Sequence, residues 1–575
     1  MTDASTTPRT MDTPTTPTAL DTLLAQVVAQ PVLFAARPTR LALQGLELAP
    51  PVRCTLRVNV WRNHAIENLL SLAAPYFAFA GIATDFRLGH YDDSLQFAQH
   101  QSADVELLWL DSERYLGQQS TGAWAGWLLQ RVQALRARSA APIVLASWIA
   151  EADASVLQQV ADACPATYFA DLGALCAQAG VALTDRRTAA VAGTPLANAA
   201  QPLIARKLAC HWLAGAALPP IKAVVLDLDH TLHAGVLGED GVDGVSISAG
   251  HAQLQRMLSG LRQRGIFLAL ASRNERHDVE ALFAQRSDYP LRWSDFSATE
   301  VSWQPKAQTI AQIAHSLRIS PDAMLFVDDN AGELSSVRSA LPQLHVLHAD
   351  TAAELTERAI EFYPGLWRWR IDSDDAKRVQ DLQANAERAA LQASAADSGS
   401  YFSSLQVELG YALDPSEQLA RAAALCQKTN QFNLALRRFG EAELAQYFSA
   451  SNACVAMVSM RDRLADSGNI AIIVAERSAD VLRVEELCIS CRAMGRGLED
   501  TVVMGALAAM PVFEGCSEVA FVVRHGPRNG PALEWLAALL GSSTPPEGEQ
   551  RISAARIRAF QPDPHLTLTY HRTPQ

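Results

Sequence analysis

The residues of this chain best suited to chemistry follow a short apolar run that begins at residue 224. The run is followed by Asp227, Asp229 and Thr231. Its valine-rich composition predicts a buried strand. Side chains alternate along a strand, but the turn after it can bring both carboxylates to one pocket. Such a pair at the carboxyl end of a parallel strand suits a magnesium ion, a phosphate group and a covalent step. An exposed strand end with two solvated aspartates is the structural alternative.

Three later features favour the chemical interpretation. Residues 265–274 form an apolar run ending near Ser272, whose hydroxyl could bind a phosphoryl oxygen. Lys306 precedes a helical pattern and could neutralise phosphate charge. A third apolar run, residues 324–330, leads into Asp328 and Asp329. Strands of this kind separated by helical segments predict a doubly wound parallel sheet with its site at the carboxyl edge.

This order of motifs resembles the haloacid dehalogenase (HAD) phosphatase superfamily. The resemblance implies that Asp227 attacks phosphorus and that Asp229 protonates the leaving oxygen and then activates water. The implied phosphate-binding residues are Thr231, Ser272 and Lys306, and the implied Mg²⁺ ligands are Asp227, the main-chain carbonyl of Asp229, and Asp328 or Asp329. These roles agree with the need of a transferring phosphoryl group to spread its charge onto a metal, a lysine and hydroxyl donors. The Gly-containing segment 232–241 is short, which predicts a small flap rather than a cap domain.

Composition limits the classes of partner and compartment. The chain has 575 residues, 49% hydrophobic and 19% charged, which predicts three or four globular domains. A net charge of −13 argues against nucleic acid or an anionic membrane as the main partner. We find no apolar stretch long enough for a transmembrane helix. The nine scattered cysteines are typical of a cytoplasmic protein, and the pair Cys488 and Cys491 lacks the further ligands of a zinc site.

Patterning divides the chain into successive α/β units. The Thr- and Pro-rich residues 1–18 predict a disordered tail. Strand and helix patterns alternate over residues 53–185, which predicts a flavodoxin-like layer, and residues 186–219 then predict a connection. The HAD-like domain spans 220–365, and a charged, Ala-rich helical connector spans 366–399. Residues 400–572 form a further α+β domain.

Two segments of this last domain could bind a thioester partner. Arg492, Gly495, Arg496 and Gly497 lie between a predicted strand and a predicted helix. Free amides at a helix amino terminus bind pyrophosphate, and the pattern resembles the acyl-CoA loop of Gcn5-related N-acetyltransferases (GNAT). A plain turn is an equal alternative. The second segment, residues 426–439, is polar and could line an acyl channel or be a solvated surface. The candidate channel residues are Asn430, Gln431, Asn433 and Cys491.

Together, the HAD motifs, the sequence QKTNQFNL and the sequence SCRAMGRGLE resemble the FkbH-like family, whose HAD part is of the IIIC type. The resemblance covers residues 53–572 and implies a non-catalytic SGNH-like amino-terminal layer, a HAD phosphatase domain and a GNAT-like acyltransferase domain. Family members are associated with polyketide-type pathways. They dephosphorylate 1,3-bisphosphoglycerate and load a glyceryl unit onto the phosphopantetheine of an acyl carrier protein.

The sequence departs from the family pattern at two places. The first motif carries His230 and His233, which could alter flap contacts or be surface replacements; the surface interpretation is favoured. Many members have a cysteine before the serine of the second motif, where this chain has Ala271, so a thioester at that position is in doubt. No nucleophilic Gly-Asp-Ser motif is found in the amino-terminal layer.

Three functions are compatible with these features. The first is a Mg²⁺-dependent phosphatase and acyltransferase that acts on a phosphorylated small acid and a carrier protein. The second is a phosphatase with an acyl-CoA-dependent acyltransferase domain in surface-glycan biosynthesis. The third is a scaffold that docks carrier proteins without turnover. The acidic and basic HAD positions are all filled with competent residues, which argues against the scaffold.

Overall fold

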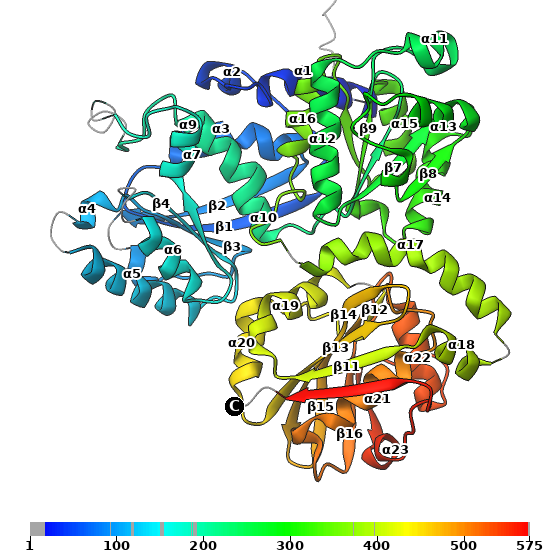
Figure 1. The fold of residues 1–575 in the computed structure, drawn as a ribbon. Helices are drawn as coiled ribbons and strands as arrows, with labels where there is room; N and C mark the ends of the chain where they lie inside the picture. Colours follow the sequence, from blue (N-terminus) through cyan, green and yellow to red (C-terminus); the bar gives the residue numbers. More distant parts are fainter. Residues whose placement is uncertain are drawn as a thin grey trace, which may run out of the picture.

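The computed structural model describes residues 18–91, 94–116, 120–149, 154–185, 187, 193–371, 373–395, 397–429 and 431–572. The predicted disordered tail lies outside these residues apart from Thr18, whose side chain caps the first helix. The chain is a multidomain α/β protein with two five-stranded parallel sheets and one larger mixed sheet (Figure 1). In the described part of the chain, no helix is long and apolar enough to cross a membrane.

The first sheet has the strand order β2-β1-β3-β4-β5 with parallel pairing throughout, which is the flavodoxin-like order. Its strands are β1 (Cys54–Arg62), β2 (Ile82–Tyr91), β3 (Val105–Trp109), β4 (Ile143–Ser147) and β5 (Thr167–Asp171). Its helices are α3 (Glu67–Phe79), α4 (Glu113–Leu116), α5 (Thr121–Arg136), α6 (Ala154–Asp162) and α7 (Leu172–Gln178). The predicted parallel layer is confirmed. The sequence patterns did not reveal β2, an edge strand that is mostly half-exposed and therefore lacks a continuous apolar run.

The segment predicted to connect the first two sheets is part of the core. Its described residues form α9 (Gln201–Lys207), a π-helical segment η3 (Leu208–Leu213) and α10 (Ala214–Ala217). α9 and η3 pack against α3. Two further helices, α1 (Ala19–Leu33) and α2 (Arg40–Gln44), precede the first strand. One hydrophobic cluster extends from Ala29 to Leu366, so the first two sheets share a core. Alanines in this segment had indicated a linker, but small side chains also permit close helix packing.

The second sheet has the order β10-β9-β6-β7-β8, again parallel throughout. Its strands are β6 (Ala223–Leu226), β7 (Phe267–Ser272), β8 (Ala298–Val301), β9 (Met324–Asp328) and β10 (His345–His348). Its helices are α11 (Leu237–Gly244), α12 (Ala249–Gln263), α13 (Arg276–Gln285), α14 (Lys306–Ser316), α15 (Ala331–Ala340) and α16 (Ala353–Glu361). The central strand β6 lies between β7 and β9, so the carboxyl ends of these three strands meet at one edge. The predicted flap is α11, a short helical excursion.

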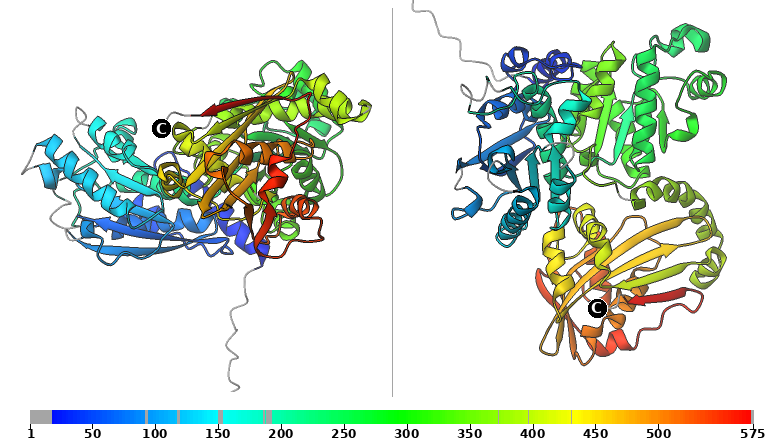
Figure 2. Two further views of the ribbon diagram at one scale, coloured as in Figure 1. Left: turned by 90° about the horizontal axis from the view of Figure 1, so that it is seen from below. Right: turned by 60° about the vertical axis from the view of Figure 1, so that its left-hand side comes forward.

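The long helix α17 (Ser373–Ser394) lies between the second sheet and the third domain (Figures 1 and 2). It lies within residues 366–399, the predicted helical connector, and leads into α18 (Ser398–Leu405). Its first turn approaches the second domain so closely that a Cβ atom on Gly265 would lie 2.1 Å from the Asp375 carbonyl oxygen. On the other side, a Cβ on Gly468 would lie 2.5 Å from Asp374 Oδ1. Two glycines therefore allow both domains to reach this turn.

The third domain is built on the mixed sheet β17-β16-β15-β14-β13-β11-β18. Its strands are β11 (Glu408–Leu413), β12 (Phe432–Asn433), β13 (Ala453–Arg461), β14 (Asp466–Ser478), β15 (Val481–Ile489), β16 (Glu518–Val523), β17 (Gly548–Ser553) and β18 (Thr567–Arg572). Its helices are α19 (Leu419–Lys428), α20 (Glu441–Ser449), α21 (Glu499–Ala509), α22 (Gly530–Leu540) and α23 (Ala554–Arg558). The strand and helix predicted on either side of Arg492 and Gly497 are present as β15 and α21.

Two neighbouring strands of this sheet, β15 and β16, pair only from Val481 to Val484 on the β15 side. Beyond that point the segment 432–434 lies between them. Leu434 N donates to Leu487 O of β15 at 3.2 Å, and Arg524 N donates to Leu434 O at 2.9 Å. Part of the segment 426–439, considered above as an acyl channel or a solvated surface, therefore closes a gap in the sheet.

Candidate active site

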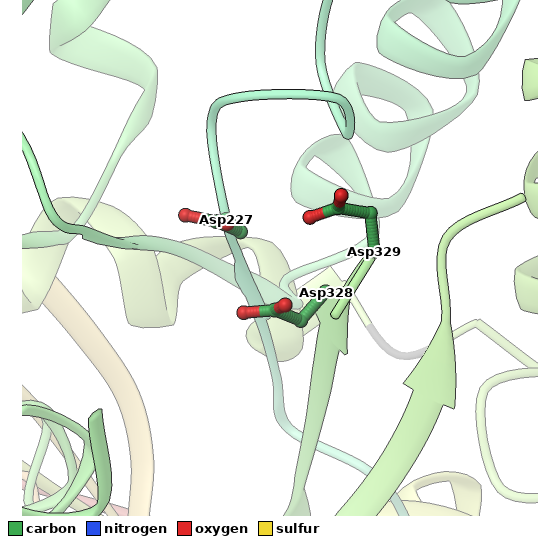
Figure 3. A group of neighbouring side chains, drawn as sticks. All are labelled: Asp227, Asp328 and Asp329. Atoms are coloured by element: carbon green, nitrogen blue, oxygen red, sulfur yellow. The ribbon is translucent and has the colours of Figure 1, made fainter. Parts of the chain in front are cut away.

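Three carboxylates meet at the carboxyl edge of the second sheet. Asp227 directly follows β6, Asp328 ends β9 and Asp329 comes next in the chain. Ligand oxygens of all three lie within 4.8 Å of one another. Figure 3 shows the carboxylates directed to the same side of the sheet. Parallel pairing of β6 with β9 produces this arrangement, because it aligns Leu226 with Val327, the residues just before Asp227 and Asp328.

A buried lysine joins this cluster from the amino end of α14. Lys306 Nζ lies 2.8 Å from Asp227 Oδ2 and also contacts Asp328 Oδ2. Burial would lower the pKa of Lys306, but the two carboxylates raise it above its ordinary value, so the amine stays protonated. Burial, reinforced by Asp328, raises the pKa of Asp227 to about 7 even though Lys306 opposes the shift. Burial and Asp328 also raise the pKa of Asp329.

The donor set fits a magnesium ion. Asp227, Asp328 and Asp329 offer hard carboxylate oxygens, which Mg²⁺ prefers. Three carboxylates and one ammonium leave two negative charges in a partly buried space, and a divalent cation would balance them. Burial is the main cause of the raised pKa values of Asp227 and Asp329, and the negative charge of Asp328 adds to it.

The carboxylate of Asp229 does not join this cluster. Its Oδ1 accepts hydrogen bonds from His233 Nε2 at 3.1 Å and Leu237 N at 3.0 Å, and its Oδ2 accepts one from Asn274 Nδ2 at 2.7 Å. Burial would raise the pKa of Asp229, but these hydrogen bonds outweigh it and hold the pKa below its ordinary value. The Asp229 side chain is directed to the flap, so only the main-chain carbonyl of Asp229 can serve as the predicted Mg²⁺ ligand.

The favoured interpretation of His233 as a surface replacement is wrong. Its side chain is fully buried, and its Nδ1 lies 2.9 Å from the Tyr289 hydroxyl while Nε2 contacts Asp229. His230, by contrast, is exposed, as the surface interpretation predicts. Tyr289 gave no sequence signal, because it reaches His233 from a loop 56 residues further along the chain.

The remaining predicted phosphate-binding residues lie close to this edge. Ser272 ends β7 and its Oγ accepts a hydrogen bond from Asn274 Nδ2 at 3.0 Å. Asn274 thus links Ser272 to Asp229. It lies two residues after Ser272 in the predicted segment, but no role was predicted for it. Thr231 is buried, and its Oγ1 has no hydrogen-bond partner among the described residues. A buried hydroxyl of this kind is suited to a ligand oxygen.

The loop predicted to bind pyrophosphate makes structural contacts instead. Arg492 Nη1 donates to Ser467 O at 2.8 Å and to Asp374 O of α17 at 3.2 Å. Arg496 contacts Asp381 of α17. Both arginine side chains are buried. The amide of Gly495 donates to Glu499 Oε1 at 2.9 Å, which places a carboxylate at the amide predicted for an anion. Gly495 and Gly497 have φ angles of 72° and 70°. Positive φ angles favour glycine, which explains the residue type at both positions. These contacts favour the plain-turn alternative.

The predicted channel residues divide into three groups. Gln431 and Cys491 line a cavity between the second and third domains. Asn433 is fully buried and closes a local turn, accepting a hydrogen bond from Leu436 N at 2.7 Å. Asn430 lies outside the described residues.

No protein-family model and no curated protein matches this sequence. Solved structures give weak similarities. The N-terminal part of a Bacteroides fragilis protein, containing a phosphatase domain complexed with Mg, has 19% identity and a TM-score of 0.43, over 59% of this chain and 99% of that one. A spermidine N-acetyltransferase mutant from Vibrio cholerae has 11% identity and a TM-score of 0.20, over 27% and 97%. A tandem GNAT protein from the clavulanic acid biosynthesis pathway has 14% identity and a TM-score of 0.18, over 23% and 43%. These similarities are too low to indicate an activity, so the functional conclusion depends on the geometry of the site.

Proposed function

We propose that the second domain is a Mg²⁺-dependent phosphatase of the HAD type. The observation that carries this proposal is the cluster of Asp227, Asp328 and Asp329 around Lys306, with Asp229 held separately by His233 and Asn274. This arrangement separates a nucleophile beside a cation from a proton-transfer group, and phosphoryl transfer needs both. The three clustered carboxylates would hold Mg²⁺, and the bound ion would neutralise charge on the phosphoryl oxygens.

The residues supply the other parts of a two-step hydrolysis. Asp227 Oδ attacks phosphorus and the bond from phosphorus to the leaving oxygen breaks. That oxygen takes a proton from Asp229, which must first bind one because its pKa lies below the ordinary value. Asp229 then takes a proton from water, whose oxygen attacks the aspartyl-phosphate and releases inorganic phosphate with Asp227 restored. Lys306 holds a phosphoryl oxygen and stays charged because of its carboxylate neighbours. Ser272 and Thr231 offer hydroxyl donors at the same edge.

The substrate follows from the family resemblance. We propose a phosphorylated three-carbon acid of the 1,3-bisphosphoglycerate type, with the glyceryl unit passing to the phosphopantetheine thiol of an acyl carrier protein. Such an acyl phosphate is already activated toward a thiol. The chain has Ala271 just before Ser272, and Ala271 is fully buried in β7, so a covalent thioester at that position is not part of the proposal. We place the acyl transfer step in the third domain.

The experiment incubates the full chain with candidate phospho-acids, Mg²⁺ and a phosphopantetheinylated carrier protein. Released phosphate and the mass of the carrier protein are measured together. The proposal predicts phosphate release and a carrier mass increased by one glyceryl unit. Phosphate release with acylation only from acyl-CoA would instead support the surface-glycan alternative. The absence of phosphate release from every phospho-acid would support the scaffold alternative.

A further inference from the structure

A cavity lies between the second and third domains, at the amino edge of the sheet that carries Asp227 at its other edge. Its walls come from Lys222 before β6, Phe267 at the start of β7, helices α17 and α19, and the loop after β15 that contains Cys491. The centres of water molecules can occupy about 100 Å³ of it, and it opens to solvent. A single water needs only about 10–15 Å³ by the same measure, so a phosphate-sized group fits.

The walls of this cavity are strongly basic. Of its 21 lining residues, seven are lysine or arginine and one, Asp381, is acidic. The basic residues are Lys222, Arg318, Arg378, Arg421, Lys428, Arg492 and Arg528. Carboxylates that pair with them from outside the lining are Asp375, Asp374 and Asp322. Seven cations therefore face four carboxylates, an excess of three positive charges in a chain whose net charge is −13.

Two of these cations bond only to neutral carbonyls in the described contacts. Lys222 Nζ donates to Lys428 O at 3.1 Å, and Arg492 donates to Ser467 O and Asp374 O. An adjoining cavity shares Lys222, Arg378 and Lys428 with the first and adds further basic residues, which are Arg264, Arg368 and Arg370. Burying cations without matching anions is costly, so an anionic ligand would be stabilising here.

The pKa values agree with this crowding of positive charge. Burial, with Arg421 and Arg378 nearby, lowers the pKa of Arg492 to about 10. Burial, with Arg368 and Arg378 nearby, lowers the pKa of Lys428 to about 8, although Asp375 opposes the shift. A bound anion would oppose the part of both shifts that comes from the neighbouring arginines.

We propose that this interdomain cavity is a second ligand site, which binds a phosphate-bearing organic molecule. The phosphate lies among the lysine and arginine side chains, whose forked donors suit its oxygens. The organic part extends toward Cys491, which is half-buried in the cavity wall as a free thiol. Two sources share this chemistry: a small phosphorylated acid and a phosphopantetheine arm.

This site is separate from the carboxylate cluster. Strand β9 runs from one edge of the sheet to the other with five residues, a span of about 17 Å. A small ligand in the cavity cannot reach Asp227. The inference therefore does not rest on the proposed phosphatase activity, and none of the cavity residues belongs to that site.

The test is alkylation of Cys491 by iodoacetamide in the full chain, followed by peptide mass spectrometry. The probes are inorganic pyrophosphate, 3-phosphoglycerate and coenzyme A, each compared with potassium chloride at equal ionic strength. Cys54, which is exposed on the first domain, is the reference thiol in the same sample. We expect at least fivefold slower labelling of Cys491 with pyrophosphate and with one organic probe, and unchanged labelling of Cys54.

Protection by 3-phosphoglycerate would identify the small acid as the ligand, and protection by coenzyme A would identify the phosphopantetheine arm. Even a site of modest affinity would be occupied at a probe concentration of about 10 mM. The absence of protection by every probe at that concentration would overturn the proposal.

Matched variants test whether the basic walls are responsible. Arg318→Gln removes an exposed cation of the lining, and Lys222→Met removes a less exposed one while keeping its apolar stem. Arg318→Gln should raise the probe concentration that gives half-protection of Cys491 at least threefold, and Lys222→Met should raise it at least tenfold. Arg556→Gln makes the same charge change on α23, outside the lining, and should have no effect. If Arg556→Gln and Arg318→Gln had equal effects, the protection would come from the overall charge of the protein and not from this cavity. Because Arg318 is exposed, its variant stays informative if Lys222→Met fails to fold.

Asp227→Asn separates this proposal from the phosphatase proposal. The variant should retain full protection of Cys491 while it loses phosphate release. Loss of protection in a folded Asp227→Asn protein would show that the cavity and the carboxylate cluster are one site.

Discussion

His233 Nε2 lies 3.1 Å from Asp229 Oδ1, and the opposite nitrogen of the same ring lies 2.9 Å from the Tyr289 hydroxyl. The Asp229 carboxylate can only accept a hydrogen bond, so His233 Nε2 donates to it. In the neutral imidazole Nδ1 is then an acceptor, and the Tyr289 hydroxyl, whose pKa is raised by burial, donates to it. Tyr289 and His233 thus set the orientation of the carboxylate that the proposed mechanism uses for proton transfer.

His233→Ala should lower phosphate release at least tenfold, equivalent to about 1.4 kcal/mol of transition-state stabilisation. Asp229 would lose a donor that fixes its orientation and stabilises its charged form. His230→Ala, a change at the exposed histidine three residues earlier, serves as the control and should stay within twofold of the wild type. Steady-state kinetics on a small phosphate ester measures both. Equal rates for the two variants would show that the chain from Tyr289 to Asp229 has no catalytic effect.

Asp227→Asn should reduce phosphate release to background while the protein stays folded. The amide keeps the shape of the side chain but is a very poor nucleophile. Because burial already disfavours the charged form of Asp227, loss of the charge should not lower the thermal stability appreciably. Phosphate assays and thermal melting check the two statements. Asp278→Asn, the same chemical change at a half-buried position of α13, is the control. Near-wild-type turnover by folded Asp227→Asn would exclude the phosphoenzyme mechanism.

Most of the carboxyl-edge site could be predicted from sequence because Asp227, Ser272 and Asp328 lie at or directly after the ends of short apolar strands. Parallel pairing of those strands then brings Asp227, Ser272 and Asp328 together without further information. His233 was misjudged because a flap histidine looks the same in sequence whether it is exposed or buried. Its burial depends on Tyr289, a contact that no local pattern encodes.

The interdomain contacts were beyond sequence reasoning for a similar physical reason. The loop around Arg492 has the strand, glycines and helix of an anion-binding turn, and those elements are all present. Its arginines are nevertheless buried against α17, because the charged helical connector packs between two domains. A charge pattern cannot distinguish a helix surrounded by water from one surrounded by complementary charges.

Phosphate release should stop with excess chelator and return with added Mg²⁺. Without the cation, Asp227, Asp328 and Asp329 repel one another at distances below 4.8 Å. Mg²⁺ should also raise the melting temperature of the wild type, since a ligand at 100 times its Kd adds about 2.7 kcal/mol of stability. Asp328→Asn should lose that increase. Full activity in chelator, or an unchanged Mg²⁺ effect in Asp328→Asn, would contradict the metal assignment.

Gly265→Ala should loosen the contact between the second domain and α17. A Cβ there would lie 2.1 Å from the Asp375 carbonyl oxygen, and the φ angle of +83° is unfavourable for alanine. We expect a loss of at least about 1 kcal/mol, the usual cost of a left-handed alanine before the steric clash is added. Gly260→Ala is the matched control, because its Cβ would meet no atom within 4 Å on helix α12. It should be neutral or slightly stabilising. Limited proteolysis near α17 and thermal melting would distinguish them, and equal behaviour would refute the close approach.

Lys428 should make stability depend on pH in the alkaline range. Burial and neighbouring arginines lower its pKa from 10.5 to about 8, with Asp375 opposing. Below pH 8 the amine is protonated in both states, and the folded protein carries the full cost of burying its charge. As the pH rises from 8 toward 10.5, the folded state releases the proton before the unfolded state does, so the free energy of unfolding rises. The increase is at most about 3 kcal/mol. Lys428→Met lacks this titration, and denaturant unfolding of both proteins between pH 7 and 10 measures the difference. The wild type should gain stability relative to the variant above pH 8, and a constant or falling difference would show that burial and the neighbouring arginines do not lower the pKa of Lys428.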